Sequence, residues 1–278
     1  MTRRWRSLLY VPVTSERFVA KAHTRGADAI ILDLEDAVAP SEKERARGLV
    51  AEAAAAVGQG GADVLVRINR PWRLAVRDLE AAVGPDVTGL VLPKTDSAEH
   101  VHAVAEIVGE LETEVGRTVL FPRIESAAAL LRAPEIAAAD PRVVAIGLGS
   151  TDYTLETGMA DGGDGNTIAS FHVVNAAIAA GVLPLGLVST IVGYDDLDAF
   201  RAAAQRSRDL GLRGAPCVHP SQVPILNEVF TPTPAELERA RRVVEEYEAA
   251  LAVGTGAITV DGAFVDRPYY DRARSLLA

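Results

Sequence analysis

The stretch Val119-Leu120-Phe121-Pro122-Arg123-Ile124-Glu125 is a mainly apolar, β-rich run that ends in a carboxylate. A second apolar run, Val143–Leu148, is followed within four residues by Asp152. Runs of this kind are typical of buried parallel strands. Functional groups in parallel α/β folds gather at the carboxyl ends of the strands. We therefore predict that Glu125 and Asp152 meet at one edge of a sheet and bind a hard divalent cation through oxygen. The alternative is that each carboxylate only caps a helix or favours its first turn.

Similar apolar runs recur along the chain and predict eight strands: Ser7–Val11, Ala29–Leu34, Val64–Ile68, Gly89–Leu92, Thr118–Ile124, Val143–Leu148, Leu185–Ser189 and Pro216–Val218. Alanine-rich amphipathic segments between them predict helices, among them Ser41–Val57, Ser97–Leu111, Ser126–Ala139 and Leu197–Leu210. Ser41 and Glu44 have the spacing of a capping box. Eightfold strand–helix alternation favours an α/β fold of the (β/α)8 TIM-barrel type over an open doubly wound sheet. No Gly-x-Gly-x-x-Gly motif follows the first strand, which argues against a dinucleotide site.

A break in the pattern separates the last 47 or so residues from the barrel. Pro232 and Pro234 interrupt regular structure. A charged helix is expected after them, over Ala235–Ala250, and Asp261-Gly262 between two short apolar runs is a hairpin signal. We predict a barrel domain over residues 1–230 and a helix–hairpin–helix extension over residues 231–278.

Composition excludes several classes of function. The 278-residue chain has a net charge of −10 and no cluster of Lys and Arg, so a nucleic-acid partner is not expected. No apolar run approaches the roughly 18 residues of a membrane span. The single cysteine, Cys217, excludes an intrachain disulfide and a thiolate metal cage, and we expect it to be a small core residue in a cytoplasmic protein.

Other charged residues stand at or just beyond strand ends, and each has two interpretations. Arg67 is either half of an ion pair with Glu35 or Asp36 or a fork that clamps a substrate carboxylate, and both roles are compatible. Lys94 is more commonly an electrostatic partner than a Schiff-base lysine. His219 is more readily explained as a hydrogen-bonded structural imidazole than as a base.

Several strand-end motifs together resemble those of a known family. They occur in family order through nearly the whole chain: Arg6–Pro12, Leu32–Val38, Val66–Asn69, Leu92–Lys94, Ile124–Ala127, Gly147–Tyr153 and His219–Gln222. The chain resembles the citrate lyase β-subunit-like group of the phosphoenolpyruvate/pyruvate-binding barrels (the HpcH/HpaI aldolase superfamily). That group includes malyl-CoA and citramalyl-CoA lyases.

The resemblance implies a set of roles. Glu125 and Asp152 would hold Mg2+, with Mn2+ as an alternative, and Arg67 and Glu125 would contact a 2-oxo acid. Glu35, Asp36 and Lys94 would surround these groups. The tail Asp261–Pro268 resembles the C-terminal segment of the CoA-thioester lyases, in which the aspartate matching Asp266 serves as acid/base in a neighbouring subunit. A homotrimer or hexamer is therefore expected, with residues 231–278 packed on the neighbour.

Three departures from the family pattern concern the acyl group. Val13 replaces a usual glycine, Ala169–His172 replaces a more basic sequence, and Pro184–Gly193 lacks a usual acidic residue. The metal pair and Arg67 are unaffected. The expected activity is therefore Mg2+-dependent carbon–carbon bond cleavage or formation on a 3-hydroxyacyl-CoA. The alternatives are an aldolase acting on free hydroxy-oxo acids without CoA and a non-catalytic paralogue that binds an oxo acid.

Overall fold

The computed structural model describes residues 4–113, 117–160, 164–189 and 195–277. Within these residues, eight parallel strands form one sheet with the order β7-β6-β5-β4-β3-β2-β1-β8. The strands are β1 Ser7–Pro12, β2 Ala29–Asp33, β3 Asp63–Arg67, β4 Gly89–Leu92, β5 Val119–Ile124, β6 Ala145–Leu148, β7 Leu183–Leu185 and β8 Ala215–Cys217. The two outer strands meet, because Arg213 N donates to Pro184 O and Gly186 N donates to Gly214 O, each at 2.9 Å. The sheet is thereby nearly closed, which confirms the predicted barrel.

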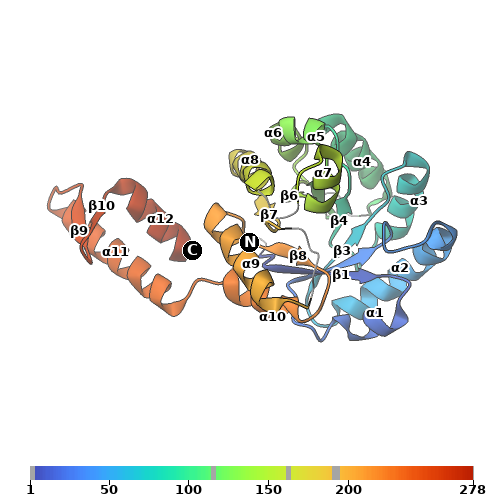
Figure 1. Cartoon of the computed structure of the whole chain (residues 1–278), viewed down its shortest axis with the longest axis horizontal. Helices are drawn as coiled ribbons and strands as arrows, with labels where there is room; N and C mark the ends of the chain where they lie inside the picture. The colour runs from blue at the N-terminus through green and yellow to red at the C-terminus, as the bar shows by residue number, and fades with distance from the viewer. Residues whose placement is uncertain (1–3, 114–116, 161–163, 190–194, 278) are drawn as a thin grey trace. The chain divides into compact units, whose positions relative to one another are not determined.

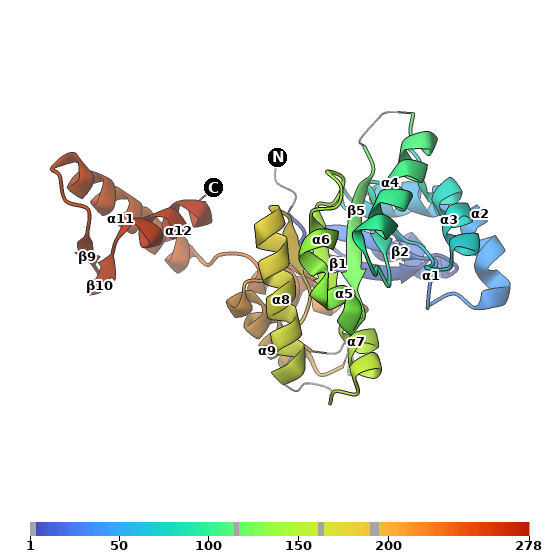
Figure 2. The ribbon, with the colours of Figure 1, turned by 90° about the horizontal axis from the view of Figure 1, so that it is seen from above.

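The connecting helices lie on the outside of the strands (Figure 1). Their bounds are α1 Glu16–Ala22, α2 Lys43–Gly58, α3 Trp72–Ala82, α4 Ala98–Leu111, α5 Ala127–Leu131, α6 Ala133–Ala137, α7 Ser150–Thr157, α8 Asp164–Ala180, α9 Leu197–Leu210 and α10 Gln222–Val229. Figure 2 shows α6 between α4 and α8, with which it packs. Among the described residues no helix is long and apolar enough to cross a membrane.

Three predicted elements differ from the observed ones. The helix expected over Ser126–Ala139 is split into α5 and α6 at Arg132, because Pro134 lacks an N–H and its ring clashes with the preceding turn. Ser41 does not cap α2; a 3-10 turn over Pro40–Glu42 comes first. The seventh strand ends at Leu185 rather than continuing to Ser189, since Val188 N donates to Ser207 Oγ on α9 and has left the sheet.

The strands bury side chains on both faces. One face packs against the helices, and the other fills the barrel with a core of Trp5, Leu8, Ala29, Ile31, Leu65, Val91, Val119, Phe121, Ala145 and Leu185. Side chains along a strand alternate between its faces. The next inward positions toward the carboxyl ends are therefore Tyr10, Asp33, Arg67 and Arg123. A polar layer thus lies directly on top of an apolar barrel interior.

A buried network holds the chain just after β3. Asp78 of α3 accepts hydrogen bonds from Arg47 Nε at 2.7 Å, from Asn69 N at 2.7 Å and from Asn69 Nδ2 at 2.6 Å. Asn69 Nδ2 also donates to Leu34 O at 2.9 Å. The ends of β2 and β3, which carry Asp33 and Arg67, are therefore fixed to α2 and α3.

Residues 231–278 form a second compact unit. Its elements are α11 Pro234–Ala252, β9 Ile258–Val260, β10 Ala263–Val265 and α12 Arg267–Leu277. Thr233 and Glu236 complete a capping box at the start of α11. Asp261 and Gly262 both have positive φ, as a tight hairpin turn requires. Stacking of Tyr247 on Tyr270, with ring centroids 4.8 Å apart, joins the two helices.

Replacing Asp78 with alanine should destabilise the barrel by about 3–5 kcal/mol, because the buried Arg47 guanidinium would lose its buried carboxylate partner. Urea unfolding checks this value. Glu44→Ala is the matched control, since it removes the exposed partner of the same arginine and should cost less than about 1 kcal/mol. Equal losses in the two variants would contradict the assignment of Asp78 as the anchor.

Candidate active site

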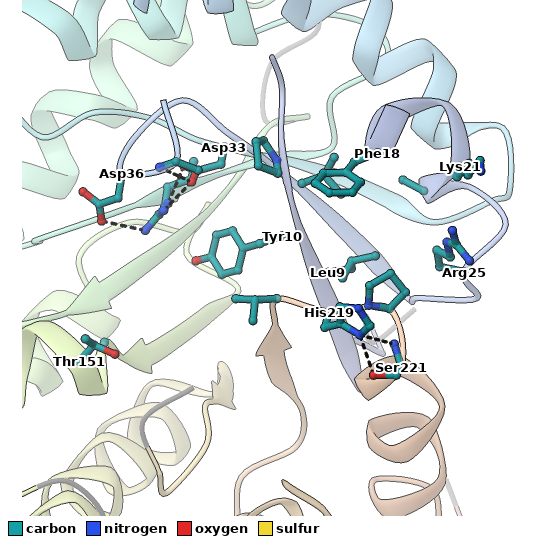
Figure 3. Close-up of a pocket in the computed structure, with 18 of the residues that line it drawn as sticks. Leu9, Tyr10, Phe18, Lys21, Arg25, Asp33, Asp36, Thr151, His219 and Ser221 are labelled. Carbon is teal, nitrogen blue, oxygen red and sulfur yellow. Dashed lines mark hydrogen bonds and ion pairs between the residues drawn. The ribbon is translucent and has the colours of Figure 1, made fainter. Parts of the chain in front are cut away.

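A pocket of about 1120 Å³ opens at the carboxyl ends of the strands (Figure 3). Its lining comes from the ends of β1, β2, β3 and β5, from α1, from the start of α7 and from the segment after β8. The lining includes Arg67, Glu125 and Asp152. Three residues singled out from widely separated stretches of sequence therefore share one cavity.

Glu125 is the most strongly perturbed carboxylate in this cavity. Its side chain is buried, and Lys94 N donates to its Oε2 at 3.1 Å. Burial raises its pKa to about 7; the Arg123 charge opposes this rise and the Asp152 charge adds to it. Gly149 permits the arrangement, because a Cβ at that position would lie 2.3 Å from Glu125 Cγ. The half-buried Asp152 stands in the first turn of α7.

The donor set fits a hard divalent cation. Both side chains offer carboxylate oxygens, and a cation would supply the positive charge whose absence makes ionisation of buried Glu125 unfavourable. Over the described part of the chain, no third His, Cys, Asp or Glu joins the pair to make a three-residue metal cluster. The other ligand positions would therefore belong to water and substrate, an arrangement typical of Mg2+.

Arg67 is held from several sides. Its Nε and Nη2 donate to the two oxygens of Asp33 at 2.8 and 2.6 Å, and Nη1 lies 2.9 Å from Glu35 and 3.5 Å from Asp36. The Tyr10 ring lies 4.8 Å from the guanidinium carbon. The expected ion pair with Glu35 and Asp36 is present, but Asp33 provides the bidentate contact. A guanidinium has five N–H donors, so Arg67 retains donors for a ligand in the pocket.

Lys94 lies beside Glu35, with Nζ 2.5 Å from Oε1. Burial acts to lower the Lys94 pKa, but the Glu35 hydrogen bond and nearby carboxylates outweigh it and raise that pKa. A Schiff-base lysine must be a neutral amine to attack a carbonyl. The structure therefore favours Lys94 as an electrostatic partner. Neither Lys94 nor Glu35 is among the pocket-lining residues, whereas the exposed Asp36 is.

The remaining predicted residues have different surroundings. His219 Nδ1 pairs with Ser221 Oγ at 2.7 Å, at the rim of the pocket (Figure 3). Cys217 is fully buried in the core, and burial raises its pKa to about 12, as expected for a packing residue. Asp266 belongs to the second compact unit, where it precedes α12.

No role was predicted from the sequence for Tyr10, Asp33 or Arg123, which line the pocket. Each lies two residues beyond an interior position of its strand, a relation that becomes visible once the inward face of the strand is known. The residues of a basic end of the pocket were not predicted either; they are Arg17, Lys21 and Arg25, from α1 or just after it. Figure 3 shows Lys21 and Arg25 on the opposite side of Tyr10 from Asp33 and Asp36, near Phe18.

The raised pKa of Glu125 predicts how stability depends on pH without metal. The pKa of Glu125 is about 7 in the folded protein and 4.5 ordinarily. The contribution of protonated Glu125 to the free energy of unfolding is therefore complete below about pH 4.5 and is lost as pH rises through 7. In EDTA, the free energy of unfolding of Glu125→Gln relative to that of wild type should rise by about 2–3 kcal/mol as the pH is raised from 5 to 8. Urea unfolding measures this difference. The exposed Glu52→Gln control should follow wild type. A difference between Glu125→Gln and wild type that does not vary with pH would refute the assignment.

The sequence of this chain is similar to those of a known protein family. Residues 6–220 match the family model described as HpcH/HpaI aldolase/citrate lyase. The chain is 34% identical to the citrate lyase subunit beta of Leuconostoc mesenteroides subsp. cremoris, over 98% of this chain and 92% of the relative. It is 36% identical to an L-malyl-CoA/beta-methylmalyl-CoA lyase of Cereibacter sphaeroides, over 94% of this chain and 90% of the relative.

A solved structure is similar over the full length. Protein CitE from Mycobacterium tuberculosis, in complex with magnesium, acetoacetate and coenzyme A, superposes with a TM-score of 0.80 and 28% sequence identity. The match covers 100% of this chain and 98% of that one.

Proposed function

Because this chain belongs to the HpcH/HpaI aldolase/citrate lyase family, we propose that it is a Mg2+-dependent carbon–carbon lyase. Its substrate would be a 3-hydroxyacyl-CoA of the malyl-CoA or citramalyl-CoA type, cleaved to or formed from an acyl-CoA and a 2-oxo acid. The observation that carries the proposal is the placement of Glu125, Asp152 and Arg67 on one pocket. Hard oxygen ligands and a guanidinium fork together suit a 2-oxo acid, which presents a carboxylate beside a carbonyl.

The oxo-acid end of the pocket would be organised by these three residues. Glu125 and Asp152 would hold Mg2+, which when bound supplies a Lewis acid for a carbonyl oxygen. Arg67 would contact the carboxylate of the oxo acid with the N–H groups not used by Asp33. Because Asp33 fixes the guanidinium before a ligand arrives, little orientation is lost on binding.

The opposite end of the pocket supports a CoA thioester over a free hydroxy-oxo acid. Arg17, Lys21 and Arg25 bring positive charge to one end of a pocket in a chain of net charge −10. Phosphate groups are bound by such clusters through charge-assisted hydrogen bonds. Phe18, half exposed, offers an apolar surface beside them. A CoA ester would place phosphates on these cations and its acyl group toward Tyr10.

Asp266 is proposed to move the proton, contributed by a neighbouring subunit. In the condensation direction its carboxylate would take a proton from the methyl group of the acyl-CoA. The resulting carbanion would attack the carbonyl carbon, and the carbonyl oxygen would take a proton from solvent to become the hydroxyl, which loses that proton again in cleavage. In cleavage the carboxyl would return that proton to the enolate carbon. Oδ1 of Asp266 is buried and has no hydrogen-bond partner among the described residues, so this oxygen is not used in a hydrogen bond within the extension.

A homotrimer or hexamer is part of the proposal. Exposed apolar side chains on or beside α5, α7 and α8 support a covered surface there: Leu131, Leu155, Met159, Ile168, Phe171 and Ile178. Apolar groups gathered on neighbouring helices mark association surfaces. A fully active monomer in native mass spectrometry would contradict a trans-acting Asp266.

An activity screen tests the function directly. With Mg2+ present, malyl-CoA or citramalyl-CoA should be cleaved, and 4-hydroxy-2-oxo acids without CoA should not. Preferred cleavage of the free acids would establish the aldolase alternative. Absence of all turnover, together with no exchange of pyruvate or acetyl-CoA methyl protons by NMR, would support a non-catalytic oxo-acid-binding paralogue.

Asp266→Asn should leave Mg2+ and oxo-acid binding unchanged while lowering kcat about 10²- to 10⁴-fold, because positioned proton transfer contributes about that factor. Calorimetry and steady-state kinetics measure the two quantities. Asp261→Asn is the control, since Asp261 lies in the same hairpin but pairs with Arg242. Full turnover of Asp266→Asn at saturating Mg2+ would rule out the acid/base role.

A further inference from the structure

Tyr10 occupies a central place in the pocket that none of the roles above uses. It is the inward residue of β1 after Leu8, and it lines the cavity together with Arg67 and Arg123. Figure 3 shows its ring reaching into the pocket from β1, with the hydroxyl on the side of Asp36 and Thr151 and away from Lys21 and Arg25. The phenol therefore faces the end that we assign to the oxo acid.

The hydroxyl is not needed to hold Tyr10 in position. The ring is secured by its strand and by the Arg67 guanidinium, whose carbon lies 4.8 Å from the ring centroid. Among the described residues, none makes a hydrogen bond to the Tyr10 hydroxyl in this structure. A phenol group at a pocket wall normally meets a polar partner, and a ligand bound in the pocket can provide one.

The charges around Tyr10 favour a partner that carries negative charge. Arg123 and Arg67 both act electrostatically on the phenol, as do Asp33 and Glu125. Asp33 is already bound in both of its oxygens by Arg67, and Glu125 is assigned to the proposed metal. Burial raises the Tyr10 pKa, so the group remains a protonated donor at neutral pH.

We infer that the Tyr10 hydroxyl donates a hydrogen bond to an oxygen of the 2-oxo acid portion of the substrate, between Arg67 and Arg123. The inference rests on the proposed function for the identity of the ligand. It adds a neutral donor beside the Arg67 and Arg123 guanidinium groups, and so helps to orient the carbonyl toward the attacking carbon. Tyr10 would thus contact substrate rather than act through Arg67.

Tyr10→Phe tests the inference cleanly, because phenylalanine keeps the ring on Arg67 and removes only the oxygen. Full-length protein with saturating Mg2+ is titrated with pyruvate and with glyoxylate by calorimetry, and kcat and KM are measured with the thioester found in the activity screen. We expect a 10- to 100-fold loss in oxo-acid affinity or in kcat/KM, the range for a hydrogen bond to a charged group. Tyr269→Phe removes the same oxygen at an exposed position and should change neither quantity.

Affinity and kcat/KM of Tyr10→Phe within twofold of wild type would overturn the inference. A second measurement does not depend on the variant's stability. In wild-type protein labelled with 3-fluorotyrosine, the 19F resonance absent from Tyr10→Phe should shift when pyruvate and Mg2+ are added, and an unmoved resonance counts against contact.

The two proposals fail in different ways. A wild-type protein that binds pyruvate but cleaves no thioester would refute the lyase function, and the calorimetric comparison would still decide the role of Tyr10. A wild-type protein that cleaves the thioester while Tyr10→Phe matches it would refute only the inference. Failure of wild type to bind any 2-oxo acid would overturn both.

Discussion

The paired hydrogen bonds between Arg67 and Asp33 are the contact on which the rest of the pocket depends. Asp33 is buried at the end of β2 and accepts from Arg67 on β3 as well as from the N–H groups of Glu35 and Ala37. One carboxylate thereby fixes the turn after β2 and the direction of the guanidinium. A buried ion pair of this kind is costly to break from one side. Both strand ends therefore remain in register above the apolar barrel.

The ion pairs formed by Arg67 and Lys94 also affect the other charges in the cavity. Arg67 pairs with Asp33, and Lys94 pairs with Glu35. Burial nevertheless raises the pKa of Glu35, and it raises that of Glu125 to about 7. Cation binding would offset the cost of a buried charge on Glu125. The basic end near α1 lies on the other side of Tyr10. The proposed substrate, an oxo acid joined to a CoA ester, would bring a metal-chelating group to one end of the pocket and phosphates to the other.

Much of the fold was predictable because the eight strands are continuous apolar runs. Such strands must be buried on both faces, which is typical of a parallel sheet with helices on its outer side. The errors were local. Pro134 split one expected helix, and the seventh strand ended early because Val188 N bonds to Ser207 Oγ on α9 rather than to a strand. Glu125 and Asp152 were found because strand ends are visible in sequence. Asp33, Tyr10 and Arg123 were not, because an inward position is recognised only once the register of the barrel is known.

The sequence by itself determined the alternation of strands and helices, the strand-end carboxylates and the hairpin turn at Asp261-Gly262, since each follows from periodicity or from backbone preference over a few residues. Only the tertiary structure decided which partner each charge takes. Arg67 pairs with Asp33, and Lys94 pairs with Glu35. Arg17 and Lys21 of α1 line the other end of the pocket. These choices depend on distances between residues 34 to 59 positions apart in the chain. Closure of the barrel sets those distances, and no local sequence pattern records them.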